Sequence, residues 1–73
     1  MADLNYGVME GTLKEIRENV LFIDIDNKTF PVWFNGDLAG LKKGDSLKLK
    51  VHIDVGGDFN LKIIADEVTR QLF

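Results

Sequence analysis

Phe22 and Trp33 are the residues of this sequence best suited to hold a flat ligand, because their rings fall in two stretches that alternate between apolar and polar residues. The stretches cover residues 20–26 and 29–34, and their period of two predicts β-strands. If Asn27-Lys28 is a two-residue hairpin loop, Phe22 lies directly opposite Trp33. Both rings then lie on the polar face of the hairpin, where an aromatic pair is either covered by another segment or binds a ligand.

Aromatic rings on a strand surface suit nucleic-acid bases, since a base can stack on a ring whatever its sequence context. The predicted site adds an apolar strip and local positive charge to Phe22 and Trp33. The strip consists of Ile16, Val20 and Pro31, and the charge comes from Lys14, Arg17 and Lys28. The opposite face of the hairpin supplies the predicted core: Leu21, Ile23, Ile25, Phe30, Val32 and Phe34.

Residues capable of catalysis or metal binding are few. The sequence contains one histidine (His52), one serine (Ser46) and no cysteine, so no nucleophile can be matched with a base. Asp24 and Asp26 lie about 7 Å apart on one strand face, which is typical of solvated charge. Gly56-Gly57 is a hairpin signal and does not lead from a strand into a helix as phosphate loops do. We therefore expect no enzyme activity, no metal site and no cofactor, and we expect His52 to be neither ligand nor base.

Composition limits the partners further. Nine basic residues against twelve acidic ones give the 73-residue chain a net charge of −3, and this overall field repels polyanions. The apolar runs are too short to span a membrane, and residues 1–5 lack the basic and apolar segments of a signal peptide. We expect a cytoplasmic protein with no membrane partner.

The remaining strands follow from the same alternation. Residues 8–17 predict a first strand, in which Gly11 indicates a bulge or a close backbone approach and the spacing of Leu13 and Ile16 requires a bulge. Glu18-Asn19 predicts a turn. Residues 35–45 predict a connector that carries Leu38 and Leu41 across one end of the core.

The fourth strand has the most regular period, with inward positions at Leu47, Leu49, Val51, Ile53 and Val55. A three-residue loop around Gly56-Gly57 pairs Ile53 with Phe59 and Lys50 with Lys62. The spacing of Ile64, Val68 and Leu72 then predicts a short amphipathic helix over residues 66–73, with a frayed tail as the alternative.

These elements predict an all-β fold: one domain over residues 1–73, with its core at about 8–66 and a tail at 67–73. Five short strands, a bulged first strand and a longer connector between the third and fourth strands suit a small five-stranded barrel of the oligonucleotide/oligosaccharide-binding (OB) type, with a possible short C-terminal helix. An SH3-like or Sm-like barrel is the nearest alternative.

Four segments resemble, in their order, the cold-shock and S1 families of nucleic-acid-binding domains. They are residues 9–14, 20–24, 30–34 and 41–51. The resemblance covers about residues 8–66. It implies an OB-fold, and it places Phe22 on an exposed aromatic position and Trp33 on a base-stacking position of those families. Ile16, Val20, Leu21 and Pro31 depart from the family pattern.

Two functions follow from the same surface. The first is weak, non-catalytic binding of single-stranded RNA or DNA. The alternative is a protein-interaction or self-association module in which the surface, with Leu72 and Phe73, docks on a protein partner or a second copy, so that the chain is a monomer or a weak homodimer. In the purely structural interpretation the ring pair only stabilises the hairpin, and Lys48, Lys50 and Lys62 form a solvated face rather than a phosphate track.

Overall fold

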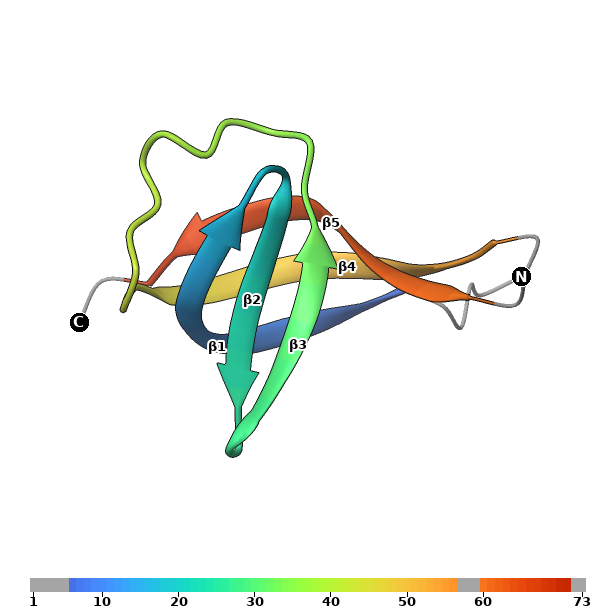
Figure 1. Cartoon of the computed structure of the whole chain (residues 1–73), viewed down its shortest axis with the longest axis horizontal. Helices are drawn as coiled ribbons and strands as arrows, with labels where there is room; N and C mark the ends of the chain where they lie inside the picture. The colour runs from blue at the N-terminus through green and yellow to red at the C-terminus, as the bar shows by residue number, and fades with distance from the viewer. Residues whose placement is uncertain (1–5, 57–59, 72–73) are drawn as a thin grey trace.

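The computed structural model describes residues 6–56 and 60–71 and places them in a small closed β-barrel (Figure 1). The strands follow the order β1-β2-β3-β5-β4 around the barrel, with β3 parallel to β5 and every other pair antiparallel. Their bounds are β1 Tyr6–Arg17, β2 Val20–Ile25, β3 Lys28–Trp33, β4 Ser46–Val55 and β5 Leu61–Arg70. The predicted all-β, five-stranded barrel is confirmed. Among the described residues there is no helix that could span a membrane.

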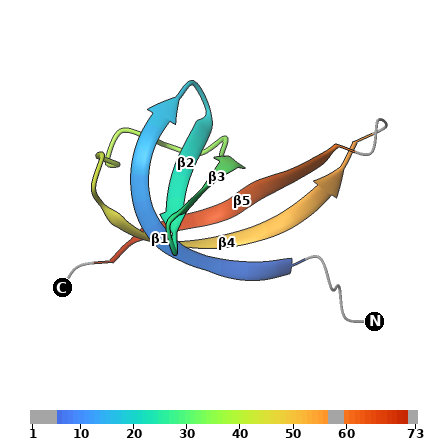
Figure 2. The same ribbon diagram turned by 60° about the horizontal axis from the view of Figure 1, so that its bottom comes forward.

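Strand β1 closes the barrel by bending from one neighbour to the other. Its residues 6–12 pair with β4, and its residues 12–17 pair with β2 (Figure 2). The predicted bulge is present, because the register shifts between Leu13 and Glu15 and leaves Lys14 as the extra residue. The close approach at Gly11 is confirmed as well, since a Cβ atom there would lie 2.6 Å from the Asp24 carbonyl oxygen.

The core lies between the two halves of this bent sheet, and it is entirely apolar. Ile25, Phe30 and Phe34 are half-buried, and with their more deeply buried neighbours they confirm the predicted inward face of the β2–β3 hairpin. No polar residue is fully buried among the described residues. The buried residues are Leu13, Leu21, Ile23, Val32, Leu47, Leu49, Val51 and Ala65.

The turn between β2 and β3 differs from the prediction by one position. The loop is Asp26-Asn27, with φ angles of 50° and 68°, and such a pair of positive φ angles is typical of a type I′ turn. Phe22 therefore pairs with Pro31 rather than with Trp33, and Trp33 pairs with Val20. The predicted pairing of Phe22 with Trp33 is wrong, but the shift is two residues, so each side chain keeps its face.

This turn offers a local test. Asn27→Val should lower the free energy of unfolding by about 1–2 kcal/mol, because a β-branched residue is strained at positive φ. Lys28→Val, at the next and equally exposed position but in an extended strand, should change it by less than about 0.5 kcal/mol. Urea titrations of both variants would measure the difference, and an equal loss in both would contradict the assigned turn.

Strands β4 and β5 pair in a different register from the predicted one. Ile53 pairs with Ile63, and Lys50 pairs with Glu67 instead of Lys62; Phe59, the predicted partner of Ile53, lies outside the described residues. The predicted helix over residues 66–73 is wrong up to Arg70, since β5 continues to that residue, while Leu72 and Phe73 lie outside the described residues. A register shift opposite Lys50 and Val51 makes Asp66 an extra residue in β5.

The connector between β3 and β4 passes over the top of the barrel in Figure 1. Leu38 and Leu41 pack against the core cluster, as predicted. Two local hydrogen bonds hold the connector in shape. The Leu41 N–H donates to the Leu38 carbonyl oxygen (3.1 Å), and the Lys42 N–H donates to Asp45 Oδ2 (2.8 Å). The connector therefore covers one end of the barrel, and within residues 6–56 and 60–71 it does not cross the outer face of β2 and β3 (Figure 1).

Candidate nucleic-acid interface

Four residues form an apolar block on the outer face of the β2–β3 hairpin, and we call it the aromatic patch: Val20, Phe22, Pro31 and Trp33. Val20 pairs with Trp33 and Phe22 pairs with Pro31, while the intervening Leu21 and Val32 point into the core. The two rings thus occupy diagonal positions, whose Cα atoms lie roughly 7–8 Å apart and within reach of aromatic side chains. Pro31 is exposed and the other three are half-buried.

The end of the patch around Trp33 is anchored by the backbone. The Phe34 N–H donates to the Asn19 carbonyl oxygen (2.8 Å), and the Asn19 side-chain amide donates to Asn35 Oδ1 (3.0 Å). These bonds tie the β1–β2 turn to the residues that follow Trp33. A ring held on a tied strand end loses little conformational freedom when a ligand stacks on it.

Strand β5 places two further residues beside the aromatic patch, and the sequence did not indicate this contact. Trp33 pairs with Ile64 in the parallel β3–β5 contact, which extends the apolar row beyond Trp33. Lys62 lies two positions earlier on β5, and its Nζ sits 5.4 Å from the centroid of the Trp33 ring. An ammonium group at this distance makes a cation–π contact, and it brings a positive charge directly to the aromatic ring.

Two of the predicted site residues lie away from the patch. Ile16 pairs with the buried Leu21 and packs against the core, because the bulge at Lys14 reverses the parity of the residues after it. Lys28 pairs with Ile25 at the turn and has the parity of the inward residues Phe30 and Val32. Ile16 does not extend the outer apolar strip, and Lys28 does not place its charge beside the rings.

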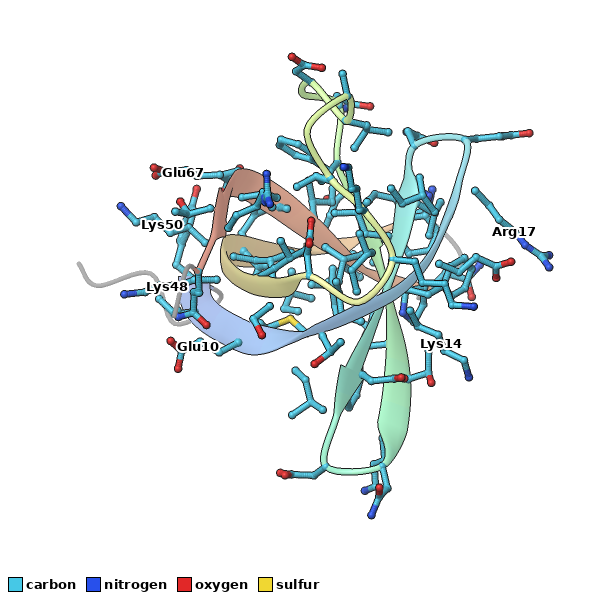
Figure 3. All side chains as sticks on the ribbon, turned by 90° about the vertical axis from the view of Figure 1, so that its left-hand side faces the viewer. Glu10, Lys14, Arg17, Lys48, Lys50 and Glu67 are labelled. Carbon is cyan, nitrogen blue, oxygen red and sulfur yellow. The ribbon has the colours of Figure 1, made fainter. Side chains whose placement is uncertain are left out.

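The two remaining basic residues lie along β1. Arg17 pairs with Val20 at the border of the patch, but its Nε lies 3.2 Å from Glu15 Oε2, with both side chains largely exposed. Lys14 lines a surface depression together with Glu15, Ile16 and Lys43. Figure 3 places Lys14 and Arg17 on the same side of the molecule. Positive charge therefore flanks the patch on the β1 side, and Glu15 offsets part of it.

Each of the two lysines of β4 lies opposite a carboxylate on a neighbouring strand. Lys48 pairs with Glu10 across the β1–β4 ladder, and Lys50 Nζ lies 3.2 Å from Glu67 Oε2. Figure 3 shows these four side chains together on the side opposite Lys14 and Arg17. Alternating charges of this kind are typical of a solvated sheet face and give little attraction for a phosphate chain.

His52 and the carboxylates near it lie in separate polar contacts. His52 Nδ1 lies 2.8 Å from Asp66 Oδ2, and its ring centroid lies 5.5 Å from that of Tyr6. Asp24 accepts a hydrogen bond from the Thr29 hydroxyl (2.6 Å) instead of pairing with Asp26. In residues 6–56 and 60–71, no three metal-binding side chains gather around one point.

No protein-family model matches the sequence, and a search of the curated proteins returned no relative.

Proposed function

We propose that this protein is a non-catalytic module that binds single-stranded nucleic acid weakly by stacking bases on the aromatic patch. The observation that carries the proposal is Trp33, a half-buried indole on the outer face of a sheet with the Lys62 ammonium 5.4 Å from its ring centroid. Base stacking on such rings contributes about 1–3 kcal/mol per base, and a lysine beside the ring can pair with the phosphate of the stacked nucleotide.

The proposal includes an OB-fold related to the cold-shock and S1 domains. OB-folds are five-stranded barrels that bind oligonucleotides on the face of their second and third strands, and the aromatic patch lies on β2 and β3. The strand order β1-β2-β3-β5-β4 supports this assignment. The ligand would cross the hairpin from Phe22 toward Trp33 and continue over Ile64.

Binding should be weak because the charge is sparse. The net charge of −3 opposes a polyanion. Among the described residues, Lys62 lies over the Trp33 ring and Arg17 pairs with Val20 at the border of the patch, so we expect these two side chains to contact phosphates. Neutralising about two phosphates of a single strand gives a slope of roughly −1.4 for the logarithm of the binding constant against that of the salt concentration. A far steeper slope would place the binding surface elsewhere.

Trp33→Ala tests the proposal. It should weaken binding of mixed-sequence single-stranded oligonucleotides by about 1–3 kcal/mol, that is by about five- to more than a hundredfold. Titrations followed by amide chemical shifts would measure this loss. The fold should persist, since the side chain points away from the core. Leu61→Ala is the matched control, because Leu61 is 67% exposed and lies outside the patch.

The outcomes separate the two functions predicted for this surface. Equal binding by Trp33→Ala and the wild-type protein would remove the nucleic-acid proposal. If Trp33→Ala changed the oligomeric size instead, the patch would be a protein-docking surface. Unfolding of Trp33→Ala would assign the ring to the core, and Lys62→Met would then test the ligand contact without removing the ring.

A further inference from the structure

One half of β1 has a neighbour on only one side. Residues 6–11 pair with β4, and pairing with β2 begins at Thr12. Within the part of the chain that the structure describes, no strand pairs with the other side of residues 6–11. In Figure 2 this segment forms the lower border of the β1–β4–β5 part of the sheet. The barrel is thus closed around its middle and open along this edge, which we call the β1 edge.

The hydrogen bonds of Leu13 identify the backbone groups that this edge presents. Its N–H donates to the Asp45 carbonyl oxygen (2.8 Å) and its carbonyl oxygen accepts from the Gly44 N–H (2.7 Å), so Leu13 faces the β4 side. Backbone groups of an antiparallel strand alternate between its two sides. The residues of the same parity as Leu13 therefore bond to β4, and Tyr6, Val8 and Glu10 direct their N–H and C=O groups outward.

The side chains of the β1 edge favour contact with another strand. Tyr6 is 61% exposed and Val8 is 57% exposed, and residues 6–11 contain no lysine, no proline and a single charge, at Glu10. Soluble proteins usually protect a free edge with charges or proline. Strand β5 follows this rule. After Ile64, the last of its residues that pairs with β3, it carries three charged residues: Asp66, Glu67 and Arg70.

We propose that two copies of this chain associate by antiparallel pairing of their β1 edges. With the two-fold axis at Val8, each Val8 faces the Val8 of the second copy, and each Tyr6 faces the second copy's Glu10. The outward N–H and C=O groups of three residues on each strand then satisfy one another, as in a hydrogen-bonded antiparallel ladder. The two β5–β4–β1 segments join into one continuous six-stranded sheet.

Avoidance of like-charge contacts favours this register. A register that places Glu10 opposite Glu10 sets like charges directly against each other, which destabilises a ladder. The two-fold axis at Val8 instead places each Glu10 between Lys48 of its own β4 and the uncharged Tyr6 of the second copy. Valine against valine at the axis adds a β-branched cross-strand pair.

A ladder of five residues per chain buries far less area than the roughly 1,200–2,000 Å² of a stable interface. We therefore infer a weak dimer that forms with increasing concentration. Each copy has a net charge of −3, so salt should strengthen the dimer by screening this repulsion. Nucleic-acid binding should weaken with salt, and the opposite dependence keeps this inference separate from the proposed function.

Sedimentation and amide chemical shifts, followed from micromolar to millimolar protein, test the dimer. Wild-type protein should dimerise, and the amides of Tyr6, Val8 and Glu10 should shift most. Val8→Lys should remain monomeric at all concentrations, and so should Val8→Pro, which removes an outward N–H that β4 does not use. Leu61→Lys makes the same exchange at another exposed apolar residue and should dimerise like the wild type.

A cross-link tests the register. The chain has no cysteine, so Val8→Cys introduces a unique thiol at the two-fold axis, where opposed Cα atoms lie about 5.5 Å apart, a separation that a disulfide spans. Under mild oxidation Val8→Cys should form dimers much faster than Leu61→Cys. A wild-type protein that stays monomeric at millimolar concentration would overturn the proposal, and so would equal cross-linking of the two cysteine variants.

Discussion

Ile23→Ala is expected to lower the free energy of unfolding by about 2–4 kcal/mol, the usual cost of truncating a buried isoleucine and leaving a cavity. Ile23 is fully buried, between Leu13 on β1 and Phe30 on β3. A domain of this length has a total stability of roughly 4–11 kcal/mol at about 0.05–0.15 kcal/mol per residue. The variant should therefore lose much of its folded population at 37 °C, as measured by urea titration and thermal unfolding. Val51→Ala, at the centre of β4, should lower the free energy of unfolding by a similar amount.

Lys48→Ala provides the control for this loss. Lys48 is exposed on the outer face of β4 between the buried Leu47 and Leu49, and its removal should cost less than about 0.5 kcal/mol. Damage of the same size from Lys48→Ala and Val51→Ala would mean that β4 is turned the other way, with its lysines inward.

The faces of β2 and β3 could be predicted from their period of two although the register between them was wrong. Moving the loop from Asn27-Lys28 to Asp26-Asn27 shifts the β2–β3 pairing by two residues, which leaves Leu21 and Val32 inside and Phe22 and Trp33 outside. The residue types at the turn indicate the correct loop, Asp26-Asn27. A type I′ turn needs positive φ at both central residues, and aspartate and asparagine tolerate this better than lysine does.

The β4–β5 register could not be read from the sequence, because apolar residues alternate along both candidate pairings. Ile53 meets an apolar partner at Phe59 as well as at Ile63, so matching apolar pairs cannot choose between them. The predicted helix had a related cause. The prediction rests on the spacing of four between Ile64 and Val68, but the extra residue at Asp66 shifts the alternation of β5 between them, so that Val68 packs against the core while Ile64 pairs with Trp33.

The candidate site was predicted only where it depends on neighbouring residues in the sequence. Val20, Phe22, Pro31 and Trp33 share one hairpin, so alternation alone places them on one face. The contact of Lys62 with Trp33 depends on the parallel pairing of β3 with β5. Strands joined in this way are distant in the sequence, and no local pattern specifies their relative position.

Gly11→Ala is expected to destabilise the barrel although it adds only one methyl group. The added Cβ would lie 2.6 Å from the Asp24 carbonyl oxygen and 2.6 Å from Ile23 Cγ2. Neither atom can move without displacing β2, since one belongs to the backbone and the other to a fully buried side chain. We expect a loss of at least about 1–3 kcal/mol in the free energy of unfolding, the range for overpacked sites, measured by urea titration.

Gly7→Ala is the matched control, because Gly7 lies on the same strand with the same parity and a Cβ there meets nothing within 4 Å. In an unhindered position this exchange reduces the freedom of the unfolded chain and stabilises a protein by about 0.4–1 kcal/mol. The two variants make the same chemical change four residues apart and should move the stability in opposite directions. If Gly11→Ala were as stable as Gly7→Ala, β1 would not bend against β2 at Gly11, and the barrel would close at a different point.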